Sequence, residues 1–260
     1  MKHLFYFLSL VLLMAFGMPE KKITVFMIGD STMADKPLAG NPERGWGQLF
    51  PQFFTNQVVI RNYAVNGRST KSFIREGRWD SVMKLLQKED YVFIQFGHND
   101  EKIEDTNRYA APHTLYRTNL IRFVNDALSK GAHPILVTPV MRRKFDEQGN
   151  FVDQHGDYPD VVRAIASEMK IPLIDLHRSS EKLITGQGVE GSKKLFLWID
   201  PKHFAAAPNG RKDDTHFSSY GAAEMASLVC RELKEKRLPL SQYLKPSAFA
   251  EKDQFEIPIV

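Results

Sequence analysis

The residues best suited to chemistry are Ser31, Asp213 and His216. Ser31 follows an apolar run, residues 23–28, that predicts a buried strand, and Gly29 breaks this strand just before the hydroxyl. A hydroxyl opens an ester or amide carbonyl only when a base takes its proton and a third group fixes the tautomer of that base. His216 has the type required of the base. Asp213, three residues earlier, can turn back within one tight loop to hold the imidazole N–H.

Two alternatives accompany this interpretation. A Gly-Asp-Ser tripeptide by itself is more typical of a strand-to-helix turn in which Asp30 or Ser31 caps the following helix, and the three clusters downstream favour the catalytic interpretation. Asp30 is expected to support the turn and not to act in the chemistry. Asp214 is the alternative to Asp213 as the acid beside the histidine.

An acyl-transfer site also needs donors for the oxyanion that develops on the carbonyl oxygen. Gly67 has no side chain, so its backbone N–H can approach a substrate oxygen closely. Asn99 offers a neutral amide N–H, which does not repel a protonated His216. Together with the backbone N–H of Ser31, these groups form the expected oxyanion hole.

Short apolar segments alternate with helical patterns along the chain. The expected strands are residues 23–28, 58–62, 91–96, 134–138 and 171–175. The expected helices are residues 48–54, 79–87, 114–130, 158–169 and 220–236. This alternation predicts an α/β domain whose parallel sheet is covered on both faces.

In such sheets the ligand site forms outside the carboxyl ends of the strands. The candidate residues follow the ends of predicted strands: Ser31 the first, Gly67 the second and Asn99 the third. Asp213 and His216 come after a long stretch that follows the fifth strand. The predicted topology therefore brings the candidate residues to one edge of the sheet.

Four sequence blocks carry a family resemblance. Gly29-Asp30-Ser31, the glycine of Asn66-Gly67-Arg68-Ser69, Gly97-His98-Asn99-Asp100 and Asp213-x-x-His216 resemble the four blocks of the SGNH or GDSL hydrolases. Thr32 and the segment Gly45-Trp46-Gly47 make the chain most similar to the rhamnogalacturonan acetylesterases within that superfamily. The resemblance implies a three-layer α/β/α sandwich of flavodoxin-like type, with strand order 2-1-3-4-5. It also favours Asp213 over Asp214 as the acid of the triad.

The activity that this resemblance implies is removal of O-acetyl groups from a plant cell-wall polysaccharide, the rhamnogalacturonan of pectin, through an acetyl-enzyme and without a cofactor. Acetylxylan or another acetylated carbohydrate is the alternative substrate. A lipase or thioesterase of the same superfamily should have a wide apolar acyl groove, and the polar, charged loops argue against one. A non-catalytic carbohydrate-binding protein should have lost Ser31 or His216, and a nucleotide-binding protein should carry a glycine-rich phosphate loop after the first strand.

Length and composition predict one α/β domain. The chain has 260 residues, of which 43% are apolar and 25% charged. Residues 1–17 have the charged start, apolar stretch and small final residues of a signal peptide, and the apolar stretch is shorter than a bilayer requires. We therefore expect a signal peptide over residues 1–17, a hydrolase domain over 18–238 and a tail over 239–260. The mature protein is expected to be exported, periplasmic or secreted, with no membrane or nucleic-acid partner.

Neither a disulfide nor a metal site is indicated. Cys230 is the only cysteine, and it falls in an apolar helical pattern that predicts burial. No CxxC or HExxH motif occurs, and the eight histidines are not grouped at metal-binding spacing. The formal charge of +4 falls to +3 without residues 1–17, which contain Lys2 and no acid.

Five cationic residues are expected on loops around the same strand ends. They are Arg68, Arg142, Arg143, Lys144 and Lys212. As a set they suit a polymer that carries carboxylates, such as the galacturonate-containing part of pectin, because an arginine can bind a planar carboxylate with two hydrogen bonds. The alternative is a solvated basic rim that binds nothing.

Overall fold

The computed structural model describes residues 22–205 and 207–246. Its centre is a five-stranded parallel sheet with the order β2-β1-β3-β4-β5, which confirms the predicted class and strand order. The strands are β1 (Ile23–Gly29), β2 (Val58–Asn62), β3 (Tyr91–Gln95), β4 (His133–Val137) and β5 (Leu173–Ile174).

Both faces of the sheet are buried because successive side chains on each strand point to opposite sides. On β1, Val25 and Met27 belong to one hydrophobic cluster, while Phe26 and Ile28 belong to the other. The central strands therefore consist of consecutive apolar residues, and this pattern is what predicted them from the sequence.

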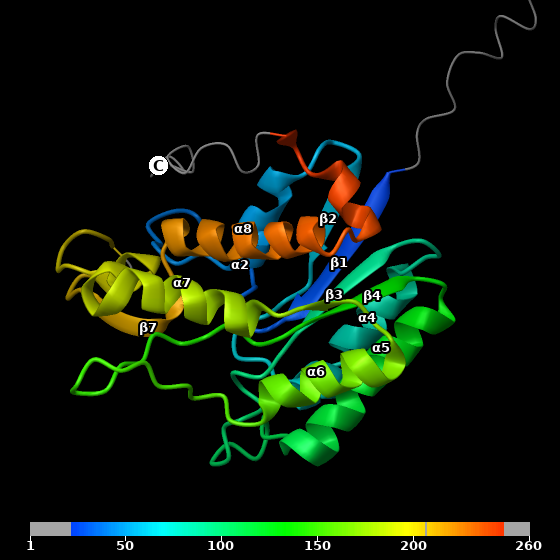
Figure 1. Cartoon of the computed structure of the whole chain (residues 1–260), viewed down its shortest axis with the longest axis horizontal. Helices are drawn as coiled ribbons and strands as arrows, with labels where there is room; N and C mark the ends of the chain where they lie inside the picture. The colour runs from blue at the N-terminus through cyan, green and yellow to red at the C-terminus, as the bar shows by residue number, and fades with distance from the viewer. Residues whose placement is uncertain (1–21, 206, 247–260) are drawn as a thin grey trace, which may run out of the picture.

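Helices cover each face of the sheet (Figure 1). One layer contains α2 (Trp46–Leu49), η1 (Phe50–Phe53), α7 (Leu176–Gly191) and α8 (Ser219–Glu235). The other contains α3 (Thr70–Arg75), α4 (Arg78–Leu85), η2 (Pro112–Tyr116), α5 (Arg117–Ser129) and α6 (Tyr158–Met169). The helix expected over 158–169 has the predicted bounds, whereas α3 and α7 were not predicted.

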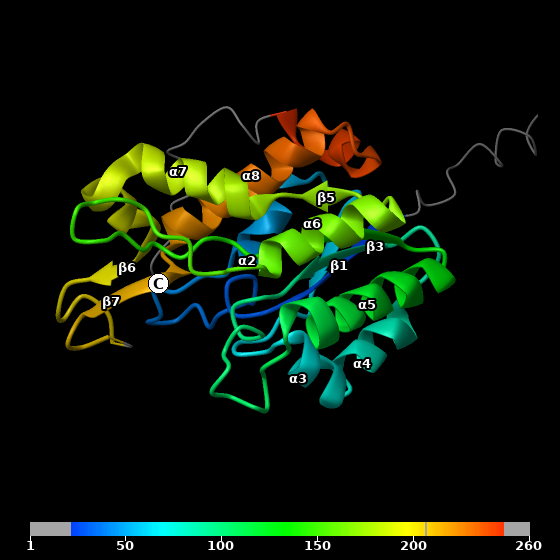
Figure 2. The ribbon, with the colours of Figure 1, turned by 60° about the horizontal axis from the view of Figure 1, so that its bottom comes forward.

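An antiparallel hairpin lies beside the main sheet, and Figure 2 shows it away from the five parallel strands. It consists of β6 (Phe196–Ile199) and β7 (Arg211–Phe217), and the turn η3 (Ser192–Leu195) precedes it. Asp213 and His216 were expected on a loop but lie on β7, and Asp213 turns back to His216 where the register of β7 against β6 shifts. The N–H of Arg44 donates to the carbonyl of Phe217 at 3.1 Å, so the hairpin is fixed to the segment that follows Ser31.

The packed structure continues beyond the expected boundary at residue 238. The turn η4 (Pro239–Tyr243) buries Leu240, and the N–H of Lys245 donates to the carbonyl of Phe53 at 2.8 Å. The expected signal peptide and residues 247–260 of the expected tail lie outside the described residues. Within residues 22–205 and 207–246, no helix has the length and apolar character needed to cross a membrane.

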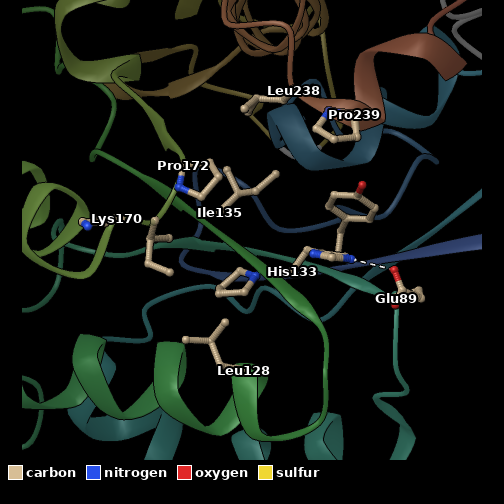
Figure 3. A pocket seen from close by; sticks show the side chains of 11 residues that line it. Glu89, Leu128, His133, Ile135, Lys170, Pro172, Leu238 and Pro239 are labelled. Carbon is tan, nitrogen blue, oxygen red and sulfur yellow. Dashed lines mark hydrogen bonds and ion pairs between the residues drawn. The ribbon is translucent and has the colours of Figure 1, made fainter.

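A cavity of about 410 Å³ lies at the amino ends of β3 and β4 (Figure 3). Leu128, Ile135 and Pro172 line it, and His133 lies 3.0 Å from Glu89 at its margin. Ser31 follows the opposite, carboxyl end of β1. None of the residues proposed for chemistry lines this cavity.

We predict that Gly221→Ala destabilises the protein by about 1 to 3 kcal/mol or more. A Cβ at this position of α8 would lie 1.7 Å from the carbonyl oxygen of Leu195, which is backbone and cannot rotate away. Gly186→Ala in α7 is the matched control, because a Cβ there meets nothing within 4 Å and alanine favours helix by about 1 kcal/mol. Thermal unfolding measures both variants. Equal midpoints for the two would contradict the close packing of α8 against η3.

Candidate active site

Ser31 lies in a tight turn directly after β1. Gly29 permits the close approach of β1 to β3 just before this turn, because a Cβ there would lie 2.6 Å from the carbonyl oxygen of Gln95. Asp30 is fully buried, and its Oδ1 accepts hydrogen bonds from the backbone N–H of Thr32 at 2.9 Å and from the Thr32 hydroxyl at 2.7 Å. Asp30 therefore supports the turn that carries Ser31, as expected.

The hydroxyl of Thr32 continues this network into the core. It accepts a hydrogen bond from Nε2 of Gln95 at 3.0 Å, and Oε1 of Gln95 accepts one from the indole N–H of Trp46 at 2.6 Å. All three side chains are buried. A leucine at position 32 has no hydroxyl to donate to Asp30 or to accept from Gln95, so this network gives Thr32 a structural role.

Asp30 also lies against His98, with its Oδ2 3.3 Å from Nδ1 of the ring. Burial raises the pKa of Asp30, but His98 and the donors of Thr32 outweigh burial and lower it to about 2. Burial lowers the pKa of His98 to about 4, despite the attraction of Asp30. The His98 ring is therefore neutral at pH 7, where the Asp30 carboxylate depends on the Thr32 donors.

The structure brings Ser31, His216 and Asp213 into one hydrogen-bonded line. Nε2 of His216 lies 2.9 Å from Oγ of Ser31, and Nδ1 lies 2.8 Å from Oδ2 of Asp213. The backbone N–H groups of Thr215 and His216 donate to Oδ1 of Asp213 at 2.8 and 3.0 Å. The geometry matches what a serine nucleophile and its base require.

The charge of Asp213 fixes the tautomer of His216. Burial raises the pKa of Asp213, but hydrogen bonds from the ring and backbone of His216 outweigh burial and hold it well below its usual range. An ionised carboxylate can only accept hydrogen bonds. Nδ1 of a neutral His216 must therefore carry the proton, which leaves Nε2 free to accept the proton of Ser31.

Asp214 faces a different set of partners. Its Oδ1 lies 2.8 Å from Nη1 of Arg143 and accepts a hydrogen bond from the indole of Trp198 at 2.8 Å. Asp213 reaches His216 because the backbone turns back onto its carboxylate, with the N–H groups of Thr215 and His216 donating to its Oδ1, at the point where the register of β7 against β6 shifts. The geometry thus selects Asp213 between the two acids.

The two oxyanion candidates lie on neighbouring loops. Gly67 has φ of +73°, a left-handed conformation that favours glycine. Asn99 is buried, and its amide N–H donates to the carbonyl of Arg68 at 3.2 Å. Nη1 of Arg108 donates to Oδ1 of Asn99 at 3.2 Å, so the amide cannot flip without turning its NH₂ toward a cation. One N–H of Asn99 remains for a substrate oxygen.

A chain of charged groups joins the triad acid to the loop of Gly67. Arg211 contacts Asp213 at 2.5 Å and Glu43 at 3.0 Å, and the other oxygen of Glu43 lies 2.7 Å from Lys36. Lys36 donates in turn to Oδ1 of Asn66. Burial raises the pKa of Glu43, but the adjacent Lys36 outweighs burial and lowers it. This chain positions both halves of the site.

Three of the five predicted substrate-binding cations, Arg68, Arg142 and Arg143, form ion pairs with acidic side chains. Arg68 lies 3.0 Å from Glu76, and Arg142 forms an ion pair with Glu101. Lys144 and Lys212 are exposed.

Arg143 is a correction, because it does not lie on the rim. It is 5% exposed, bonds Asp214 and Ser192, and stacks over Trp198 with 4.9 Å between the guanidinium carbon and the ring centroid. A planar guanidinium stacks well on an aromatic face, which explains its burial.

Sequence reasoning missed Arg108, Lys36, Glu43 and Arg211. Arg211 and Asp213 are two residues apart on β7 and therefore share a face, so a strand prediction there would have found the pair. Arg108 follows β3 in an irregular segment, where no periodicity places a side chain. Among residues 22–205 and 207–246, no group of three or more His, Cys, Asp or Glu side chains could hold a metal ion.

Comparison with known proteins identifies relatives of the whole described domain. The model of the GDSL-like lipase/acylhydrolase family matches residues 25–229. The rhamnogalacturonan acetylesterase RhgT of Bacillus subtilis is 43% identical over 87% of this chain and 96% of its own length. The probable rhamnogalacturonan acetylesterase YesY of the same organism is 35% identical over 84% of this chain and 95% of its own length.

Solved structures share the architecture. The crystal structure of Bacillus subtilis YxiM matches with a TM-score of 0.71 at 26% identity, covering 85% of this chain and 58% of that one. An acetylxylan esterase from Geobacillus stearothermophilus matches with a TM-score of 0.59, covering 83% of this chain and 96% of that one. Its identity of 16% supports the fold alone.

The two adjacent acids provide a matched test. We predict that Asp213→Asn lowers kcat for p-nitrophenyl acetate by on the order of 10³- to 10⁴-fold, because the ring of His216 takes the wrong tautomer. Asp214→Asn should instead lower the thermal midpoint, because buried Arg143 loses its partner, and kcat should fall less than 10-fold. Steady-state kinetics and thermal unfolding check both. A larger loss of kcat in Asp214→Asn would reverse the assignment.

Proposed function

Because this chain belongs to the GDSL-like lipase/acylhydrolase family and is a carboxylic ester hydrolase, we propose that it deacetylates rhamnogalacturonan through an acetyl-enzyme. The observation that carries the chemistry is the hydrogen-bonded line from Ser31 through His216 to Asp213. The observation that favours this substrate is the 43% identity to a rhamnogalacturonan acetylesterase over 96% of that protein.

In the first half-reaction, Oγ of Ser31 attacks the acetyl carbonyl carbon while Nε2 of His216 takes the hydroxyl proton. The carbonyl oxygen becomes an oxyanion, and the N–H groups of Ser31, Gly67 and Asn99 donate to it. Asp213 stabilises the imidazolium that forms. Collapse of the intermediate breaks the bond to the sugar oxygen, which receives the proton from His216. Ser31 then carries the acetyl group.

In the second half-reaction, water attacks the acetyl carbonyl carbon while His216 takes one of its protons. The same donors meet the second oxyanion. Its collapse breaks the bond to Ser31, whose oxygen recovers the proton from His216, and acetic acid leaves and loses its remaining proton to water. The cycle consumes one water for each ester and restores every group, so it calls for no cofactor.

The surroundings of the site favour a polar acyl carrier over a lipid. A cavity of about 400 Å³ that Gly67 lines is bordered by arginine, glutamate and aspartate side chains. A long acyl chain would leave these charged groups without water. A small acetyl group on a hydroxyl-rich polymer leaves them solvated or bonded. Export of the mature chain, expected from residues 1–17, is part of the same proposal.

We predict that Ser31→Ala lowers kcat for acetate release by on the order of 10³-fold or more, because the triad acts as a unit. Acetate release from acetylated rhamnogalacturonan measures the loss. Ser129→Ala, an exposed serine at the end of α5, is the control and should keep wild-type turnover. A folded Ser31→Ala enzyme with a tenth of wild-type turnover would exclude Ser31 as the nucleophile. Acetylated xylan turned over faster than acetylated rhamnogalacturonan by the wild type would overturn the substrate assignment.

A second prediction concerns the oxyanion donor. Asn99→Ala should lower kcat by about 10²- to 10³-fold, or roughly 3 to 4 kcal/mol, with little change in KM, because the donor acts on charge that develops only in the transition state. Steady-state kinetics separate the two parameters. An increase in KM at unchanged kcat would make Asn99 a ground-state binding residue.

A further inference from the structure

His155 is a buried histidine that lies between the loop after β4 and the loop that carries Asn99. Its side chain is 0% exposed. Nδ1 of the ring lies 2.8 Å from Oε2 of Glu101, and Nε2 lies 2.9 Å from the carbonyl oxygen of Val140. A carboxylate and a carbonyl can only accept hydrogen bonds, so the ring donates to both sides. The proposed reaction cycle makes no direct use of this ring.

Glu101 connects His155 to the proposed oxyanion donor. It lies two residues after Asn99, and its N–H donates to the carbonyl of Gly97 at 3.1 Å, which closes the turn that contains Asn99. Burial raises the pKa of Glu101, but the hydrogen bond from His155 and the nearby positive charges outweigh burial and lower it. The ionised carboxylate therefore ties the Asn99 turn to His155 by a charge-assisted hydrogen bond.

The loop after β4 supports the same turn through two further contacts. Arg142 forms an ion pair with Glu101, and its Nη2 donates to the carbonyl of His98 at 3.3 Å. The ring of His155 packs edge-on against the ring of His98, with 4.6 Å between the centroids. His98 in turn lies against Asp30 in the nucleophile turn. His155 thus contacts residues that support both the oxyanion loop and the nucleophile turn.

We propose that His155 is a positioning residue for the oxyanion hole and fixes the Asn99 turn through its hydrogen bond to Glu101. The inference rests on the proposed function, because it takes Asn99 as an oxyanion donor. Catalytic groups must be held within about 0.5 Å of their productive geometry. Asn99 donates to charge that develops only in the transition state. Loss of the bond between His155 and Glu101 therefore lowers kcat and leaves KM nearly unchanged.

Two substitutions of His155 separate this role from a contribution to stability alone. The amide nitrogen of asparagine is bonded to Cγ, as Nδ1 of histidine is, so His155→Asn keeps a donor toward Glu101. The amide nitrogen of glutamine lies one bond farther out and replaces Nε2, so His155→Gln keeps only the donor toward Val140. His155→Gln should lower kcat for p-nitrophenyl acetate by about 10-fold at unchanged KM, and His155→Asn should stay within about 3-fold of the wild type. Equal losses of kcat in the two variants would overturn the proposal.

Glu101→Gln tests the same hydrogen bond from its more exposed partner, should substitutions of the buried ring prevent folding. The amide keeps the size of the side chain and removes its charge, so kcat should fall by about 10-fold at unchanged KM. Glu104→Gln is the matched control, because it removes an exposed acid three residues farther along the same loop, and it should keep the wild-type kcat. Equal kcat values for Glu101→Gln and Glu104→Gln would contradict the role of the bond.

A double-substitution cycle tests whether the effect passes through Asn99. In the Asn99→Ala background, His155→Gln should lower kcat by less than about 2-fold, because the donor that the bond positions is already absent. A full additive loss there would overturn the proposal. The cycle uses p-nitrophenyl acetate, so it holds even if the wild type fails to deacetylate rhamnogalacturonan. Asn99→Ala with wild-type kcat would contradict the proposed oxyanion hole, whereas a loss in Asn99→Ala without one in His155→Gln would contradict the role of His155 alone.

Discussion

The buried carboxylate of Asp30 is the constraint on which the nucleophile turn depends. A fully buried charge is costly unless donors stabilise it; both donors of Thr32 bond Oδ1 of Asp30 within the turn itself, and Oδ2 lies 3.3 Å from Nδ1 of His98. The Thr32 hydroxyl accepts a hydrogen bond from the side chain of Gln95, which in turn accepts one from the indole of Trp46. The position of Ser31 is therefore set by a network that extends from β1 to β3 and α2. A serine on an unsupported loop would lack this precision.

The second half of the site comes from a hairpin outside the main sheet, so it must be held by other means. The backbone bond between Arg44 and Phe217 gives it one attachment. The ion pairs of Arg211 with Asp213 and Glu43 give it another, since Glu43 lies on the segment that follows the nucleophile turn. Lys36 extends the same chain to Asn66. The nucleophile, base and oxyanion loops are thus joined by charged contacts as well as by the backbone.

The parts of this fold that the sequence predicted are those where burial imposes a pattern. Buried strands such as β1 and β3 are uniformly apolar, and α6 has a clear helical period, so their bounds followed from residue types. The strand β7 reads Arg-Lys-Asp-Asp-Thr-His-Phe and has no such pattern, because it forms by pairing with β6 and presents its residues to a polar site. The short helix α3 depends on the capping pair of Ser69 and Ser72, which is too local for periodicity to detect.

The residues of the candidate site also fall into two groups, those that the sequence predicted and those whose position only the structure shows. Ser31, Asp213 and His216 were found because their types and order are distinctive, and their distances then followed from the topology. Cations are different, because a guanidinium on a long side chain is free to turn into the core or away from it. Arg143 turned inward onto Trp198, whereas Arg108 turned toward Asn99, and neighbouring residues in space decided both outcomes. Charge along the sequence therefore predicted a basic rim, but only the partners of each cation in the structure distinguish a buried structural arginine such as Arg143 from the exposed Lys144 and Lys212.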